Sequence, residues 1–120
     1  MNNRPKEISE KFVQIIEDNL QDLINGKSDD YLDIHTIASM MNIHATHLSN
    51  TIKDTTGKSP CDICNEKTIE LAKALLSTDI SISAIAYKLT YEPTNFTKYF
   101  KRHTGMTPSI YRDGLLKENT

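Results

Sequence analysis

The sequence has few of the features that mark membrane, secreted or catalytic proteins. No apolar run is long enough to span a bilayer and no signal-peptide pattern is present, so we expect a cytoplasmic protein without a membrane partner. Only two cysteines occur, and without secretory features we expect reduced thiols. The four glycines form no phosphate-cradling loop, and no nucleophile–base pair or catalytically spaced pair of acids stands out. The sequence therefore predicts neither an enzyme nor a bound cofactor.

An excess of positive charge is also lacking, which is unusual for a protein that binds nucleic acid. The 120 residues carry 14 Lys and Arg against 16 Asp and Glu, a formal net charge of −2. The acid is concentrated in residues 1–33, with four basic and eight acidic side chains, whereas residues 34–60 and 80–108 are net positive by 1 and 3. The acidic total therefore does not exclude a local basic face.

What the sequence does contain is a segment that occurs twice. Residues 34–60 align with residues 82–108 without a gap at an offset of 48, and eight of the 27 positions are identical. The identical pairs are Ile34/Ile82, Ile37/Ile85, Ala38/Ala86, Thr46/Thr94, Lys53/Lys101, Thr56/Thr104, Gly57/Gly105 and Pro60/Pro108. Self-similarity at a fixed offset indicates one supersecondary unit used twice.

Each copy has the pattern of a helix-turn-helix. In the first copy, apolar residues at steps of three and four mark one face of a short helix, a turn follows at residues 42–44, and a second helix ends before Gly57. Asp33 and Ser81 are expected to cap the first helix of each copy. The residues expected to face inward are Ile34, Ile37, Ala38 and Met41 of the first helix and Leu48 and Ile52 of the second.

Three further helices are expected around the copies: an amphipathic helix from about Ile8 to Gly26, a linker helix after Pro60 and a short helix from Pro108 to Leu116. The linker helix, about 17 residues and roughly 25 Å long, should bury one face. That face is predicted to contain Ile63, Cys64, Lys67, Leu71, Ala74 and Leu75. We therefore predict an all-α fold of about seven helices: a domain at 1–113, with motifs at 34–57 and 82–105 and the linker helix at 60–78, then a C-terminal tail at 114–120.

The second helix of each copy carries a polar stripe opposite its apolar residues. The stripes are Thr46, Ser49, Asn50 and Lys53 in the first copy and Thr94, Thr97, Lys98 and Lys101 in the second. Hydroxyls, amides and lysines are groups that hydrogen-bond base edges and phosphates. One such stripe is ordinary polar surface, but two at equivalent positions of a duplicated helix-turn-helix favour DNA recognition. Two recognition helices that read one face of B-DNA lie one helical turn, about 34 Å, apart. A linker helix of roughly 25 Å, together with the width of the flanking helices, gives about this separation.

The stretch TIELAKALLSTDISISAIAYKL, followed by FTKYFKRHTGMTPSIYR, resembles the DNA-binding domain of AraC/XylS-type bacterial transcription regulators. The resemblance covers about residues 8–113. It implies two helix-turn-helix motifs, joined by a long helix, that bind adjacent major-groove segments. The implied base contacts are Thr46, Ser49, Asn50, Thr94, Thr97 and Lys98. The phosphate contacts expected beside them are His47, Lys53, Lys58, Lys101, Arg102 and His103.

The resemblance also bears on partners. Most members carry this domain at the C-terminus of a longer chain with an effector-binding or dimerisation domain, and some small members are little more than the domain. It therefore implies double-stranded DNA as partner, with RNA polymerase and an effector or dimerisation domain as further candidates. The sequence departs from the family pattern in a second turn one residue shorter, in Thr90 where glycine is common, and in Thr68, Asn50 and Lys98 where arginine is usual. These changes bear on sequence preference and affinity rather than on the fold.

Two alternatives remain at this point. His44-x-x-His47 and Cys61-x-x-Cys64 have the spacing of a zinc site. The helical pattern argues against a bound metal, because it places Cys64 on the inner face of the linker helix, where a cysteine acts as a small apolar residue. A redox role for the cysteine pair lacks the βαβ pattern that usually surrounds one. The other alternative is a helix-turn-helix protein-interaction module with weak or no DNA binding, which would suit the acidic total and the missing arginines.

Overall fold

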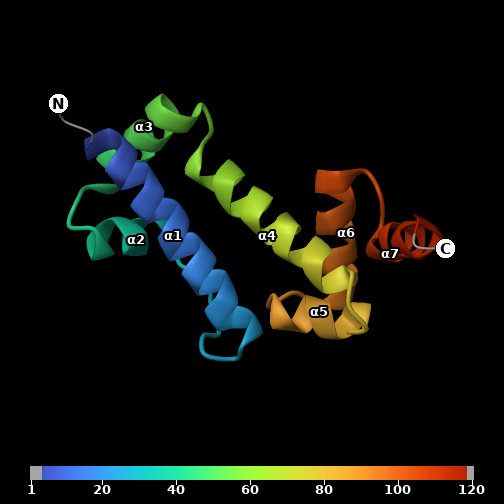
Figure 1. Cartoon of the computed structure of the whole chain (residues 1–120). Coiled ribbons are helices and arrows are strands. Elements are labelled where there is room, and N and C mark those ends of the chain that lie inside the picture. The colour runs from blue at the N-terminus through green and yellow to red at the C-terminus, as the bar shows by residue number, and fades with distance from the viewer. Residues whose placement is uncertain (1–3, 119–120) are drawn as a thin grey trace.

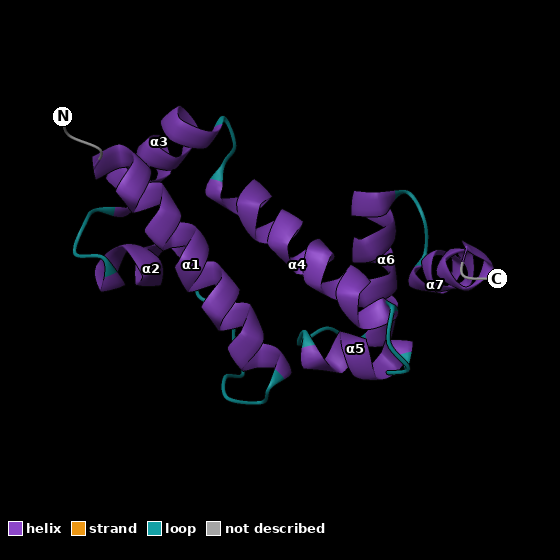
Figure 2. Ribbon diagram, in the orientation of Figure 1, coloured by secondary structure: helices purple, strands orange, loops and turns teal. Residues whose placement is uncertain are grey.

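The computed structural model describes residues 4–118, and this part of the chain folds into seven α-helices without a strand (Figure 1 and Figure 2). The predicted all-α class is thus confirmed. The helices are α1 (Arg4–Ile24), α2 (Ile34–Met40), α3 (Ala45–Thr56), α4 (Pro60–Leu76), α5 (Ile82–Lys88), α6 (Pro93–Thr104) and α7 (Pro108–Glu118). None of these helices combines the length and the apolarity that crossing a bilayer requires.

The duplication is confirmed in the backbone. α2 and α5 have 7 residues each, α3 and α6 have 12 each, and every boundary of the second pair lies 48 residues after its counterpart. The expected caps are present: the Asp33 carboxylate accepts from the Thr36 N–H at 2.8 Å, and the Ser81 hydroxyl accepts from the Ala84 N–H at 3.1 Å. Equal sequence patterns therefore give equal helix-turn-helix units.

Two separate cores form, one around each unit, and α4 contributes to both. The first core is built from α1 and the first unit and includes Phe12, Leu20, Ile37, Leu48, Ile52 and Ile63. The second core includes Ile69, Ala72, Leu76, Ile85, Leu89, Phe96 and Phe100. Figure 1 shows α4 running between the two units, and the described part of the molecule is elongated, with extents of 51 × 28 × 21 Å. The shared helix thus holds the two units apart.

The predicted inner face of α4 is wrong in part. Ile63 is buried as predicted, but Ala74 is exposed, and Thr68 and Ile69 are buried where neither was expected. The reason is that α4 packs against α1 and α3 at one end and against α5 and α7 at the other. A helix that serves two cores has no single apolar stripe, so one 3.6-residue period cannot describe it. Leu76, rather than Thr78, is its last residue.

The predicted C-terminal tail is also partly helical, because α7 continues to Glu118. Residues 1–3 and 119–120 lie outside the described residues. Tertiary contacts anchor α7: the Arg112 guanidinium donates to the carbonyls of Leu76 at 2.9 Å and Ile80 at 2.6 Å. A cation there also suits the C-terminal end of α4, where carbonyls lack helical partners. Gly114 lies in the middle of α7, and a single glycine costs a helix only about 1 kcal/mol.

The turns of the two units have the same backbone shape but different residues at their key position. Asn42 has a φ of 58° and its equivalent, Thr90, a φ of 66°. Asparagine tolerates this left-handed conformation, whereas a β-branched residue is crowded in it. Thr90, which stands where glycine is common in the family it resembles, is therefore a strained position.

Substituting the two turn residues tests this strain. We expect Thr90→Asn to raise the free energy of unfolding by about 1 kcal/mol, because the amide side chain fits the left-handed conformation better. Asn42→Thr should lower it by a similar amount, and it is a matched control because the two positions are equivalent. Urea unfolding with unchanged m values measures both effects. A Thr90→Asn protein that unfolds at lower urea concentrations than wild type would contradict the strain.

Candidate nucleic-acid interface

The candidate interface consists of the exposed faces of α3 and α6. α3 buries Leu48 and Ile52, and α6 buries Phe96 and Phe100, so the opposite face of each helix is turned to solvent. Six stripe residues are exposed: Thr46, Asn50, Lys53, Thr94, Lys98 and Lys101. The other two, Ser49 and Thr97, are half-buried at equivalent positions. The structure thus gives both stripes the same relation to their cores, while their contacts to DNA stay a prediction.

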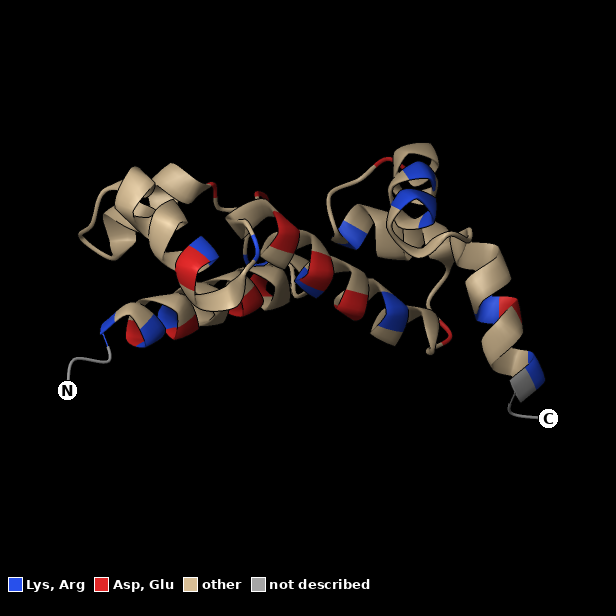
Figure 3. Ribbon diagram, turned by 90° about the horizontal axis from the view of Figure 1, so that it is seen from above, with Lys and Arg blue, Asp and Glu red and all other residues tan. Residues whose placement is uncertain are grey.

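The two stripes differ in charge. α6 carries Lys98, Lys101 and Arg102 and no acidic residue, whereas on α3 the single lysine, Lys53, is followed by Asp54. Figure 3 shows the Lys and Arg bands on α6, with Asp and Glu gathered along α4 and α1. Attraction to a phosphate backbone would therefore come mainly from the second unit.

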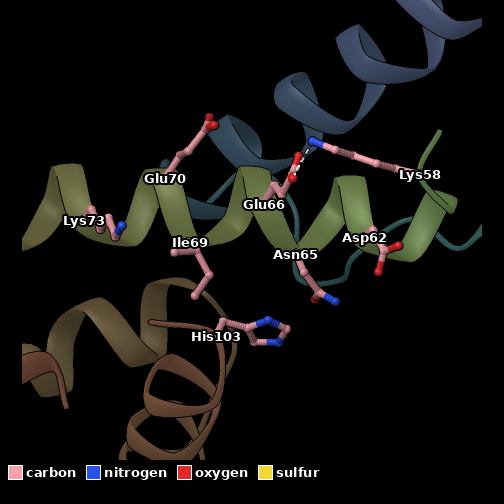
Figure 4. A pocket seen from close by; sticks show the side chains of 8 residues that line it. All are labelled: Lys58, Asp62, Asn65, Glu66, Ile69, Glu70, Lys73 and His103. Atoms are coloured by element: carbon pink, nitrogen blue, oxygen red, sulfur yellow. Dashed lines mark hydrogen bonds and ion pairs between the residues drawn. The ribbon is translucent and has the colours of Figure 1, made fainter. Parts of the chain in front are cut away.

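Two of the six expected phosphate contacts are turned toward α4 instead of standing free. The Lys58 ammonium lies 2.6 Å from a Glu66 carboxylate oxygen, although both side chains are about half exposed. His103 leans against Tyr99, with ring centroids 4.6 Å apart. Figure 4 shows His103 facing α4 across an open groove of about 610 Å³ that Glu66 and Glu70 also line. Lys58 can reach a phosphate only by leaving Glu66. The remaining candidates, His47, Lys53, Lys101 and Arg102, are exposed.

The first turns of α3 and α6 were not singled out from the sequence. Their N-cap residues, His44 and Glu92, make no side-chain hydrogen bond to the helix, whereas Asp33, Ser59 and Ser81 cap α2, α4 and α5. The first N–H groups of a helix attract phosphate because they lack partners and lie at the positive end of the helix dipole, which applies to α3 more than to α6, where the Glu92 carboxylate and Pro93, without an N–H, oppose it. Histidine and glutamate are poor N-cap residues, so positions 44 and 92 could have indicated from the sequence that these two helix starts lack a side-chain cap.

An exposed amide was also missed. Asn95 lies on the solvent face of α6, at the position equivalent to His47 of α3. Amide side chains read adenine edges in the major groove. The 48-residue offset alone would have identified Asn95, since His47 was already a candidate.

The four residues with zinc-like spacing do not gather into a metal site. His44 and His47 belong to the start of α3, whereas Cys61 and Cys64 lie on α4, with Cys61 exposed and Cys64 half-buried. Within residues 4–118, no group of three or more His, Cys, Asp and Glu side chains could hold a metal ion. Burial, with a smaller contribution from Cys61, raises the pKa of the Cys64 thiol to about 11.

Two helix-turn-helix units on a shared helix, each with an exposed polar stripe, define a class of nucleic-acid-binding fold. A family model described as a helix-turn-helix domain matches residues 37–114, so the chain belongs to this family. The fold is shared with a transcriptional regulator from Chromobacterium violaceum that is described as AraC-type, with a TM-score of 0.76 at 21% identity, over 93% of this chain and 95% of that one. The resemblance noted from the sequence is thereby confirmed.

Individual proteins agree with this assignment. The chain is 28% identical over 116 residues to YobQ, an HTH-type transcriptional regulator of Bacillus subtilis (strain 168). The aligned region covers 89% of this chain and 48% of YobQ. The C-terminal domain of AraT, a response regulator from Geobacillus stearothermophilus, superposes with a TM-score of 0.76 at 28% identity, over 89% of this chain and 84% of that one. The DNA-binding domain of AdpA, a global transcriptional factor solved in complex with a target DNA, shares the fold with a TM-score of 0.69 at 20% identity, over 87% and 91%. The chain thus spans about half the length of YobQ and nearly all of the two isolated domains.

The metal assignment can be checked directly. Protein purified without chelator should contain no stoichiometric zinc, because no three His, Cys, Asp or Glu side chains of residues 4–118 come together as zinc ligands. Elemental analysis per chain measures this, with a Cys61→Ser, Cys64→Ser variant as control. One tightly bound zinc that the double variant loses would show that these residues are wrongly placed.

Proposed function

We propose that this chain binds double-stranded DNA in a sequence-specific way and regulates transcription, with α3 and α6 in adjacent major-groove segments. One observation carries the proposal: two equivalent helices, 48 residues apart, expose matching polar stripes at opposite ends of a shared helix. The target DNA in the AdpA structure supports the proposal, because it occupies a domain of the same fold. DNA binding also implies a location in the cytoplasm, where bacterial DNA lies.

Roles follow from where each side chain lies on its helix. The exposed stripe residues Asn50 and Lys98 are at equivalent stripe centres, and their amide and ammonium groups suit base edges. Lys53 and Lys101 are one turn further toward the helix ends, where long cations suit the phosphate backbone. Thr46, Ser49, Thr94 and Thr97 would add hydroxyl contacts to bases, and His47, Lys58, Arg102 and His103 would add contacts to phosphates.

Further partners are proposed from the length of the relatives. The chain spans 48% of YobQ, so a second domain for an effector or for dimerisation is a natural companion of this one. RNA polymerase is a further partner for an HTH-type regulator. No catalytic step is proposed for this chain.

A protein-interaction module without strong DNA binding is the second candidate. It is favoured by α7, on which Ile110 and Leu116 are 59% and 61% exposed. These two side chains are six residues apart and do not share one face of α7, so they support this candidate less strongly than the two stripes support DNA binding. The same experiment distinguishes the two functions.

A salt titration tests DNA binding. If about five of the basic side chains on and beside α3 and α6 neutralise phosphates, log K should fall with log salt at a slope near −4 to −5.

Asn50→Ala and Lys98→Ala should each cost about 1–3 kcal/mol on a preferred site and far less on a scrambled duplex. Lys101→Ala should weaken both duplexes about equally, because a phosphate contact carries no base information. The preferred site is first selected from random duplexes. Absence of binding to every duplex at low salt would favour the interaction module.

Removing the partner of Lys58 gives a second test. Glu66→Gln should strengthen binding to specific and scrambled duplexes alike by about two- to fivefold at low salt, the range of an exposed ion pair. Glu70→Gln is the matched control, because it removes the same charge one turn further along α4, where Lys67 rather than Lys58 is paired at 3.7 Å. Equal gains from both variants would mean that Lys58 is not a phosphate contact and that only the overall charge matters.

A further inference from the structure

The loop between α1 and α2, residues 25–33, meets both halves of the molecule. From this loop the Tyr31 hydroxyl donates to the Leu89 carbonyl at 2.6 Å, across 58 residues of sequence. A second, longer contact runs the other way, from the Lys88 ammonium to the Ile24 carbonyl at 3.4 Å. In Figure 1 the C-terminal end of α1 lies beside α5, where these contacts form. The first unit and the second are thus joined at a point away from α4.

The first half holds Tyr31 firmly. Asn19 of α1 is only 8% exposed, and its side-chain amide binds the backbone on both sides of Tyr31. The amide nitrogen donates to the Asp30 carbonyl at 3.1 Å, and the amide oxygen accepts from the Leu32 N–H at 2.9 Å. Both residues next to Tyr31 are therefore fixed to α1 by a buried side chain. Burial also raises the pKa of the Tyr31 hydroxyl, which keeps it protonated and able to donate.

In the second half, the acceptor of this hydrogen bond is the Leu89 carbonyl, in the turn between α5 and α6. Leu89 ends α5, and its side chain is fully buried, so its carbonyl is a rigid acceptor. Three residues later the N-cap of α6 begins the recognition helix. The Tyr31 ring also meets Tyr91 edge-on, with centroids 6.4 Å apart, and Tyr91 stacks on Tyr99 of α6 at 5.0 Å. The Tyr99 hydroxyl donates to Asn65 of α4 at 2.9 Å, which closes the path back to the shared helix.

Two side-chain contacts accompany the hydrogen bond at this junction: Ile24 of α1 packs against the second core, and the Tyr31 ring contacts Tyr91. On one side lies a cavity of about 230 Å³, lined by Asn19, Tyr31 and Tyr99 among others. On the other side an open hollow of about 630 Å³ separates Ser28 and Asp29 of the loop from Tyr87 and Thr90 of the second unit. Apart from these two contacts the junction is flanked by hollows, so close packing compensates only in part for the loss of the Tyr31 hydrogen bond.

We propose that Tyr31 is a positioning residue that sets the orientation of α6 relative to α3, and with it the separation of the two half-sites that the protein accepts on DNA. The proposal rests on the DNA-binding function proposed above. Two linked recognition helices bind best when the second is already placed over its groove after the first has bound. A fixed junction therefore favours one spacing and disfavours others, whereas a loose junction accepts several spacings at lower affinity.

Spacing variants of the selected site test the proposal. Wild type, Tyr31→Phe and Tyr87→Phe are measured on the full site, on the site with one base pair inserted or deleted between its halves, and on a single half-site. Tyr31→Phe loses only the hydroxyl, and Tyr87→Phe, which is 60% exposed on α5, is the matched control. We expect Tyr31→Phe to bind the half-site like wild type, but to lose about fivefold or more of the preference for the correct spacing. A spacing preference within twofold of wild type would overturn the proposal.

A measurement without DNA separates this proposal from the proposed function. Spin labels are placed on Asp54→Cys of α3 and Asn95→Cys of α6, in a chain that also carries Cys61→Ser and Cys64→Ser. The distance distribution between the labels should be narrow with Tyr31 and clearly broader with Tyr31→Phe, at unchanged helix content. Equal distributions would overturn the positioning role even if DNA binds. Failure of wild type to bind any duplex would overturn the DNA-binding function, and a broadened distribution would then still establish that Tyr31 orients the two units.

Discussion

The architecture depends on one constraint: α4 must be buried in two cores at once. Its first part places Ile63 in the core of the first unit, and its later part places Ile69, Ala72 and Leu76 in the core of the second. Its length is set at one end by the Ser59 capping box with Pro60, and at the other by the Ser77 cap and the Arg112 contact to the last carbonyl. Because both cores pack on the same rigid rod, the separation of α3 and α6 follows from the number of residues between these caps.

Burial on two sides also explains the composition of α4. Thr68 is buried, where the resemblance would favour an arginine, and its hydroxyl donates to the Cys64 carbonyl within the helix at 2.8 Å. Its hydrogen bond is thus satisfied locally, and a short side chain lines the cavity between the halves. With no long side chain from α4 to fill this space, the tyrosines at 31, 91 and 99 make the contacts across it.

The sequence predicted what depends on local pattern. The offset of 48 residues gave both units, their caps and their inward residues, because each copy supplied independent evidence for the other. The buried face of α4 and the end of α7 could not be predicted, since the first serves two cores and the second is held by Arg112 from a distant carbonyl. Of the candidate site, the exposed stripes followed from helical periodicity. The pairing of Lys58 with Glu66 and the bond from Tyr31 to Leu89 did not, because no sequence pattern links side chains that approach only in the folded chain.

The two units are alike in backbone and unlike in charge, and this difference makes the junction more important. α6 has three strong cations and no acid, whereas Lys53 is the single lysine of α3 and is offset by Asp54. A unit with so little charge gains little from attraction to phosphates and would bind weakly by itself. The base contacts proposed for it would become effective when the other unit is bound and a rigid connection raises its local concentration at the neighbouring groove. In a protein with two strongly basic units a flexible joint would cost little. In this chain the proposed contribution of α3 to DNA binding would instead depend on α6 and on the contacts that fix the angle between the two helices.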